Sequence, residues 1–219
     1  TAFNITLTAQ DSTNNTVTGF TGTVGLSTTA GTITPTTSGS FTAGVLTQSV
    51  TVTQTGTART ITADDGSGHT GTSNTFTVDP GVLANFLVES SGGGTIPTQT
   101  AGSAFNVKVT ARDASNNTVT GFTGTVNITS SGILSSGSGT TGAFTGGVLA
   151  SHSVTISNTG SFTLSATRTG FSETGTSNTF TVNPAALHHF AIANITSPQV
   201  AGTAFNITLT AQDSTNNTV

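Results

Sequence analysis

The sequence contains no cysteine, methionine, tryptophan or tyrosine, and only 5% of its 219 residues are charged. The absence of cysteine excludes disulfide bonds, thiol catalysis and cysteine-ligated zinc. The 4 lysine and arginine residues are too few for a basic surface that follows phosphates, which argues against nucleic-acid binding. No stretch approaches the ~18 apolar residues of a membrane span. Because methionine is absent, we expect this chain to be an internal segment of a longer protein.

The polarity of the chain comes from hydroxyl and amide side chains, since threonine, serine, asparagine and glycine fill most of the sequence. Threonine is β-branched and favours strands, whereas glycine and asparagine favour turns. Disordered chains usually combine low hydrophobicity with high net charge. Here 32% of the residues are hydrophobic, Phe occurs 13 times and the net charge is −4, so we predict a folded chain.

Internal repetition is the dominant feature of the sequence. Residues 1–17 read TAFNITLTAQDSTNNTV, and residues 203–219 are identical to them. A diverged copy, SAFNVKVTARDASNNTVTGFTGTV, begins at Ser103. The repeat unit is therefore roughly 100 residues long, which is the usual size of an immunoglobulin-like sandwich.

The recurring segments also set the expected domain boundaries. The motif TGTSNTFTV ends at Val78 and again at Val182, each time just before an Asp-Pro or Asn-Pro step. We expect a first repeat that lacks its opening strand, one complete repeat, and the N-terminal part of a third. These are residues 1–79, 81–183 and 185–219.

The strand pattern has a period of two. Phe105, Val107, Val109 and Ala111 alternate with polar residues, so one face of this strand is apolar. No segment has a sustained helical period, and we predict no helix. In the complete repeat we predict strands near 84–89, 104–112, 117–120, 123–130, 147–157, 161–168 and 174–182.

Seven short strands of this kind predict an all-β fold of tandem immunoglobulin-like antiparallel β-sandwich domains, stacked end to end because the linkers are short. A β-helix is the structural alternative, but its coils are usually far shorter than ~100 residues.

Residues 201–219, AGTAFNITLTAQDSTNNTV, continue across the repeat as TGFTGTVGLSTTAG at residues 18–31. This run resembles the bacterial immunoglobulin-like (invasin-type) tandem repeats of large extracellular surface proteins. The resemblance covers every segment of the chain, but its motifs are signatures of fold without catalytic content. It implies a function only as a class, namely surface display, adhesion, stalk or filament.

The Asp-x-x-Asn-Asn loops are the strongest metal candidates. Asp11, Asp113 and Asp213 each offer oxygen ligands that could hold Ca²⁺. Each loop has a single carboxylate, however, and the same residues form metal-free Asx turns at strand ends. We favour the turn and expect no metal or other cofactor.

Histidine-containing segments give weaker candidates. Asp64 and Asp65 precede His69 in a loop whose counterpart in the next repeat contains Arg168, so a repeated metal site is not expected there. His188 and His189 begin a predicted strand, in which neighbouring side chains point to opposite faces and cannot easily share one ion.

No catalytic constellation is recognisable. Serine, histidine and aspartate are all present, but no nucleophile lies in a recognisable elbow, and we predict that the protein is not an enzyme. Lys108 is the only lysine, so lysine–asparagine isopeptide crosslinks cannot be a general feature of the repeats.

We therefore expect a non-catalytic structural segment of a bacterial-type extracellular or cell-surface fibre, which self-associates. The alternative is the stalk or ligand-binding part of an adhesin, with cell-surface or glycan ligands held by the long loops Ser90–Gly102 or Ser130–Thr141. Exposed Trp and Tyr, which sugar sites generally use, are absent from the sequence.

Overall fold

The computed structural model describes residues 1–219 and consists of strands, turns and loops without any helix. The predicted all-β fold is confirmed. The chain divides into two compact units. Unit 1 comprises Thr1–Val82 with the loop Asp113–Asn117, and unit 2 comprises Leu83–Arg112 with Thr118–Val219.

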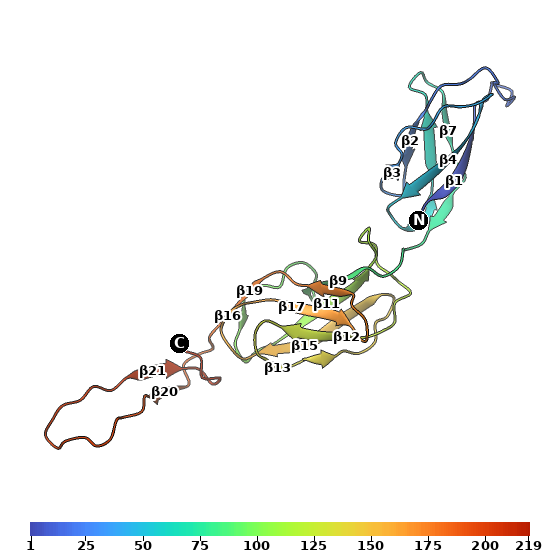
Figure 1. Ribbon diagram of the computed structural model, residues 1–219. Helices are drawn as coiled ribbons and strands as arrows, with labels where there is room; N and C mark the ends of the chain where they lie inside the picture. Colours follow the sequence, from blue (N-terminus) through green and yellow to red (C-terminus); the bar gives the residue numbers. More distant parts are fainter. The chain divides into compact units, whose positions relative to one another are not determined.

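Unit 1 contains eight strands (Figure 1). They are β1 (Phe3–Thr8), β2 (Gly25–Thr28), β3 (Ile33–Thr34), β4 (Val45–Val52), β5 (Gly56–Arg59), β6 (Ile61–Asp64), β7 (Thr70–Thr72) and β8 (Phe76–Val78).

The strands of unit 1 form one sheet of order β1-β4-β3, a second of order β2-β6-β7, and the pair β5-β8, with antiparallel pairing throughout. A small buried core lies between the sheets, since Leu26 of β2 and Ile61 of β6 belong to the same apolar cluster as Val50 of β4.

Unit 2 contains the other thirteen strands. They are β9 (Asn85–Ser90), β10 (Gln99–Thr100), β11 (Ala104–Arg112), β12 (Val126–Ser130), β13 (Leu134–Ser136), β14 (Gly139–Thr140), β15 (Val148–Ile156), β16 (Gly160–Phe162), β17 (Leu164–Arg168), β18 (Thr174–Thr176), β19 (Phe180–Asn183), β20 (His189–Ile192) and β21 (Leu209–Gln212).

Two four-stranded sheets of unit 2, β13-β15-β11-β9 and β14-β12-β17-β18, form a β-sandwich (Figure 1). Val107 and Val109 of β11 lie in one apolar cluster with Ile128 of β12 and Leu164 of β17. All four side chains are fully buried. The predicted apolar face of residues 105–111 is therefore confirmed, because alternate residues of a strand with one buried face point into the core.

Strand β1 of unit 1 pairs with β4 in the way that β11 pairs with β15, but no strand lies on the other side of β1 where β9 lies beside β11. The remaining strands of unit 2 are the sheet β10-β19-β16 and the hairpin β20-β21. Pairing is antiparallel except between β10 and β19, which are parallel.

Several predicted strands are wrong in detail. Residues 117–120 form no strand and make only a single bridge, between Arg112 and Thr118. Their backbone carbonyls are used in turns instead, since Asn117 accepts from the N–H of Asp113 and Val119 from the N–H of Phe122. The region predicted as 123–130 begins its strand only at Val126, and 161–168 is interrupted at Thr163.

The region predicted as one strand over 174–182 is two strands in different sheets. Strand β18 pairs with β17, whereas β19 pairs with β16 and β10. Between them Ser177 accepts a hydrogen bond from the backbone of Leu164, and Asn178 exchanges hydrogen bonds with the backbone of Ile96. These side-chain contacts let the chain leave one sheet for the other.

The predicted long loops also contain short strands. Residues 90–102 include β10, and residues 130–141 include β13 and β14. A strand of two or three residues has too little alternation to be recognised in a sequence rich in serine, threonine and glycine.

Candidate functional sites in the loops

The three Asp-x-x-Asn-Asn loops share one local geometry. In the first, Asp11 Oδ1 accepts hydrogen bonds from the backbone N–H groups of Thr13 and Asn15, both at 2.9 Å. The Asn15 side chain donates to Asp11 Oδ2 at 3.1 Å. Asn14 adopts a positive φ of 67°, a conformation that asparagine tolerates better than most residues.

The loops at Asp113 and Asp213 repeat this pattern. Each aspartate accepts the backbone N–H groups two and four residues later at 2.9 Å. Each also accepts the side-chain amide of Asn117 or Asn217, at 3.0 and 2.9 Å. Because both oxygens of every one of these carboxylates accept hydrogen bonds within the protein, the loops have the geometry of Asx turns. The preference for a metal-free turn over a calcium site at Asp11, Asp113 and Asp213 stays a prediction.

These hydrogen bonds shift the aspartate pKa values. The Asn15 backbone N–H, with further donors from Thr13 and the Asn15 side chain, lowers the pKa of Asp11 to about 2. Burial raises the pKa of Asp113 and of Asp213, but the asparagine side chains and backbone donors outweigh it, and both pKa values lie below the ordinary range. All three carboxylates are therefore ionised at neutral pH.

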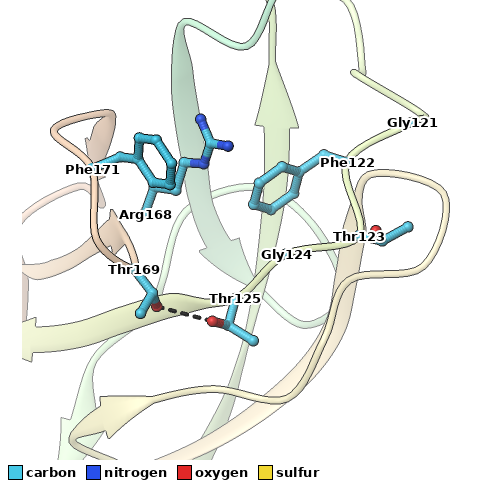
Figure 2. A pocket seen from close by; sticks show the side chains of 8 residues that line it. All are labelled: Gly121, Phe122, Thr123, Gly124, Thr125, Arg168, Thr169 and Phe171. Carbon is cyan, nitrogen blue, oxygen red and sulfur yellow. Dashed lines mark hydrogen bonds between the residues drawn. The ribbon is translucent and has the colours of Figure 1, made fainter.

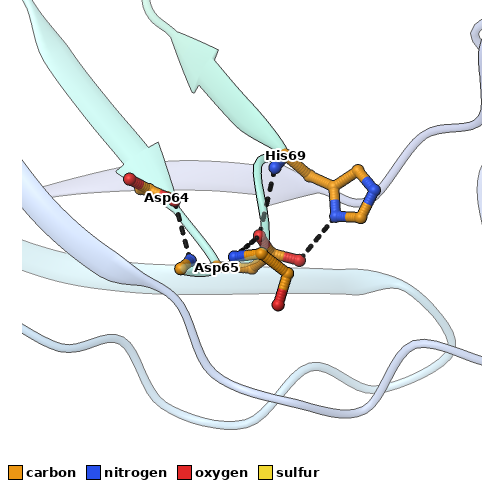
Figure 3. Close-up of polar contacts among 5 residues, drawn as sticks. Asp64, Asp65 and His69 are labelled. Carbon is orange, nitrogen blue, oxygen red and sulfur yellow. Dashed lines mark hydrogen bonds and ion pairs between the residues drawn. The ribbon is translucent and has the colours of Figure 1, made fainter.

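The loop after β6 contains a close contact between Asp65 and the exposed side chain of His69 (Figure 3). His69 Nδ1 lies 2.7 Å from Asp65 Oδ2, and the backbone N–H of His69 also donates to Asp65. The hydrogen bond from His69 lowers the pKa of Asp65 to about 2, and the same contact raises the pKa of His69. Asp64 accepts instead from the backbone N–H of Gly66. The two carboxylates thus serve separate turn contacts.

The geometric expectation for His188 and His189 is wrong. Strand β20 begins at His189, so His188 lies outside it, and the two Nδ1 atoms lie 3.2 Å apart instead of on opposite faces. No group of three or more histidine or acidic side chains in the chain comes together in a way that could hold a metal ion.

Lys108 and His152 both have protein partners. Lys108 Nζ lies 3.1 Å from Glu89 Oε2 on the neighbouring strand β9. His152 Nε2 lies 2.9 Å from the carbonyl oxygen of Gly137. No helix of the chain is long and apolar enough to cross a membrane.

A pocket of about 390 Å³ lies between the segments 121–125 and 168–171 of unit 2 (Figure 2). The guanidinium carbon of Arg168 lies 3.7 Å from the ring centre of Phe171 and 5.8 Å from that of Phe122. Arg168 also donates to Glu173 at 3.0 Å, and this ion pair offsets its charge. A hydrogen bond of 2.9 Å between Thr125 and Thr169 joins the two segments.

Phe171 is a surface feature that the sequence pattern does not single out. Its ring is 60% exposed and stacks on Arg168. The signal that could have revealed it is a lone aromatic residue inside a loop of glycine, serine and threonine. At the corresponding place, the preceding repeat has the Asp65–His69 loop, so the two repeats differ in chemistry at this position.

Comparison with known proteins does not establish a family. No family model matches the chain, and no curated protein matches it. Among solved structures, it is similar to the Escherichia coli adhesin FdeC at 20% identity and a TM-score of 0.40, over 98% of this chain and 69% of that one. It is similar to invasin, a bacterial integrin-binding protein, at 18% identity and a TM-score of 0.35, over 100% and 44%.

The chain is also similar to domains 1–6 of the surface-layer protein SbsC, at 21% identity and a TM-score of 0.33. That match covers 96% of this chain and 26% of the other, so the chain spans about a quarter of the SbsC fragment and less than half of invasin. A β-glucuronidase of Parabacteroides merdae matches 71% of the chain at 15% identity and a TM-score of 0.33.

Proposed function

We propose that this chain is a non-catalytic structural repeat segment of an extracellular or cell-surface fibre or filament of bacterial type. The observation that carries the proposal is the recurrence of seventeen identical residues, 1–17 and 203–219, with a diverged copy between them. Enzymes and specific receptors generally place unique chemistry in one site. A chain that repeats its sequence repeats one folding unit, and this suits a polymer or a spacer.

The residue composition supports the same proposal. A sandwich whose core is aliphatic and aromatic needs no cysteine, metal or cofactor to fold. The polar surface carries few charges, and exposed sheet edges are usually protected by charged side chains, lysine above all. We infer that neutral threonine-rich edges favour side-by-side association of chains. The repeat boundaries at 79–81 and 183–185 are part of this proposal.

Electron microscopy of the source cells tests this function. Antibodies raised against the purified 219-residue protein are expected to label filaments or a coat at the cell surface, at regular intervals that follow the repeats. Labelling confined to the cell interior would contradict the proposal. Antibodies adsorbed with the same protein serve as the control for specificity.

A ligand-binding adhesin repeat is the second candidate, and the Arg168–Phe171 pocket is the observation that favours it. An exposed aromatic ring fixed against a guanidinium is a rigid platform for the apolar face of a sugar or peptide. The nearby charge is balanced by Glu173, so a neutral ligand fits better than an anion.

A glycan array probed with the 219-residue protein decides between the two candidates. If this is a binding repeat, selected glycans are expected to bind, and Phe171→Ser is expected to reduce that binding at least tenfold. His69→Ser is the matched control, because it changes an exposed residue at the corresponding loop of unit 1. Binding that is equally strong in Phe171→Ser would exclude the pocket as the site.

A further inference from the structure

Two copies of one loop differ in burial although their sequences are identical. Asp11 and Asp213 occupy the same position in the seventeen-residue repeat and form the same turn. Asp11 is exposed, whereas Asp213 is fully buried and its counterpart Asp113 is only 4% exposed. The local sequence is the same for Asp11 and Asp213, so the difference must come from segments packed against the buried copies.

In unit 2, two hydrogen bonds connect the loop Asp213–Asn217 to segments far earlier in the chain. The backbone N–H of Ala185 donates to Asp213 Oδ2 at 3.0 Å. The side-chain amide of Asn217 donates to the carbonyl oxygen of Ser157 at 2.8 Å. Ala185 follows Pro184 in the linker after β19, and Ser157 follows directly after β15.

In unit 1, the loop Asp113–Asn117 makes the same two contacts. The backbone N–H of Gly81 donates to Asp113 Oδ2 at 2.9 Å, and the Asn117 side chain donates to the carbonyl oxygen of Thr53 at 2.9 Å. Gly81 follows Pro80 in the linker after β8, and Thr53 follows directly after β4. The contacted positions therefore correspond between the repeats: a residue after a linker proline and a residue at the end of a long strand.

We infer that the Asp-x-x-x-Asn loop is a fastening site by which each repeat holds the linker and one end of the repeat before it. The aspartate binds the first backbone N–H after the linker proline, since proline itself has none. The asparagine binds a backbone carbonyl at the end of the preceding repeat. Both contacts are with backbone groups, so they tolerate the change from Gly81 to Ala185 and from Thr53 to Ser157.

The hydrogen bonds to Asp113 and Asp213 are made to ionised carboxylates. A hydrogen bond to an ionised carboxylate is about twice as strong as one between neutral groups. Asp113 and Asp213 are buried and ionised, so loss of a donor would leave a buried charge with one fewer partner. A linker that contains a proline and is held by a turn has few accessible backbone conformations.

The first loop, Asp11–Asn15, has the groups to hold a partner of the same kind. Asp11 and Asn15 present the same carboxylate and amide to solvent, with only contacts inside their own loop. This surface fits the end of another repeat of the same kind, with its linker N–H and its post-strand carbonyl. The inference concerns how repeats are joined and does not depend on a cell-surface location.

Amide hydrogen exchange in the 219-residue protein, followed by NMR, tests the fastening site. In Asp213→Ala, the Ala185 amide is expected to exchange about tenfold faster or more, as loss of a hydrogen bond to a charged group implies. In Asn217→Ala, which removes the link to Ser157 but keeps the backbone donors of the turn, we expect a smaller increase at Ala185.

Asp11→Ala is the matched control, because it removes the same residue from an identical loop. The exchange of Ala185 and Gly81 should be unchanged in it. The Val219 amide, which bonds to the Ala211 carbonyl, reports on the turn itself. If Asp213→Ala accelerates Val219 but leaves Ala185 unchanged, the loop is only a local turn and the inference is wrong. Equal acceleration of Ala185 by Asp11→Ala would also overturn it.

Discussion

Replacing Ile128 by alanine is expected to lower the free energy of unfolding of the sandwich in unit 2 by about 2–5 kcal/mol. Ile128 lies in β12, and its side chain is fully buried in the core between the two sheets. Truncation removes three carbon atoms from a close-packed site, and the surrounding strands cannot collapse fully into the cavity. Urea denaturation monitored by circular dichroism measures the loss.

Ile207→Ala is the matched control for this variant. The chemical change is the same, but the Ile207 side chain is 52% exposed. The expected change is within about 0.5 kcal/mol, as for most surface substitutions. Similar losses in the two variants would mean that Ile207 is buried in solution, for example against another chain.

Gly175→Ala is expected to destabilise unit 2 by about 3 kcal/mol, the upper end of measured overpacking costs. A Cβ atom at Gly175 of β18 would lie 1.8 Å from the carbonyl oxygen of Phe86 in β9. Because the obstructing atom belongs to the backbone, no side-chain rotation can relieve the overlap, and β9 must move away from β18. Glycine in a strand often marks such a close backbone approach.

Gly71→Ala provides the control in unit 1. Gly71 occupies the corresponding position of the same TGTSNTFTV motif, but no atom lies within 4 Å of where its Cβ would stand. The substitution is expected to be neutral or to stabilise by up to about 1 kcal/mol, because alanine has fewer conformations in the unfolded chain. A large loss at Gly71, or none at Gly175 in the same urea experiment, would contradict the close approach of β9 and β18.

Gly71 and Gly175 occupy the same position of one sequence motif but have different surroundings. The sequence predicted one strand over 174–182, which the structure divides into β18 and β19, and the first copy of TGTSNTFTV is likewise divided into β7 and β8. It could not reveal why a glycine stands in the middle of the motif. That reason is the β9 backbone, which packs against Gly175 in unit 2 and has no counterpart against Gly71 in unit 1.

In the Asp-x-x-Asn-Asn loops, the sequence predicted the local turn but not the long-range contacts. The pattern Asp-x-x-Asn-Asn predicted a turn, and the local hydrogen bonds at Asp11, Asp113 and Asp213 have that geometry. The contacts with Gly81 and Ala185 span 32 and 28 residues and involve backbone groups, which leave no mark on side-chain identity. The stacking of Phe171 on Arg168 is likewise known only from the three-dimensional structure.

The alternation of apolar and polar residues by itself determined the all-β fold and the face of β11 that enters the core, and the recurrence of residues 1–17 gave the expected repeat length. Tertiary structure decided which segments become strands. Residues 1–17 and 203–219 are identical, yet Phe3–Thr8 is a strand paired with β4, whereas only Leu209–Gln212 of the second copy is a strand, paired with β20. A strand exists only where a neighbouring strand satisfies its backbone hydrogen bonds and its apolar face is covered. The residues of a segment do not reveal which other segment will be that neighbour.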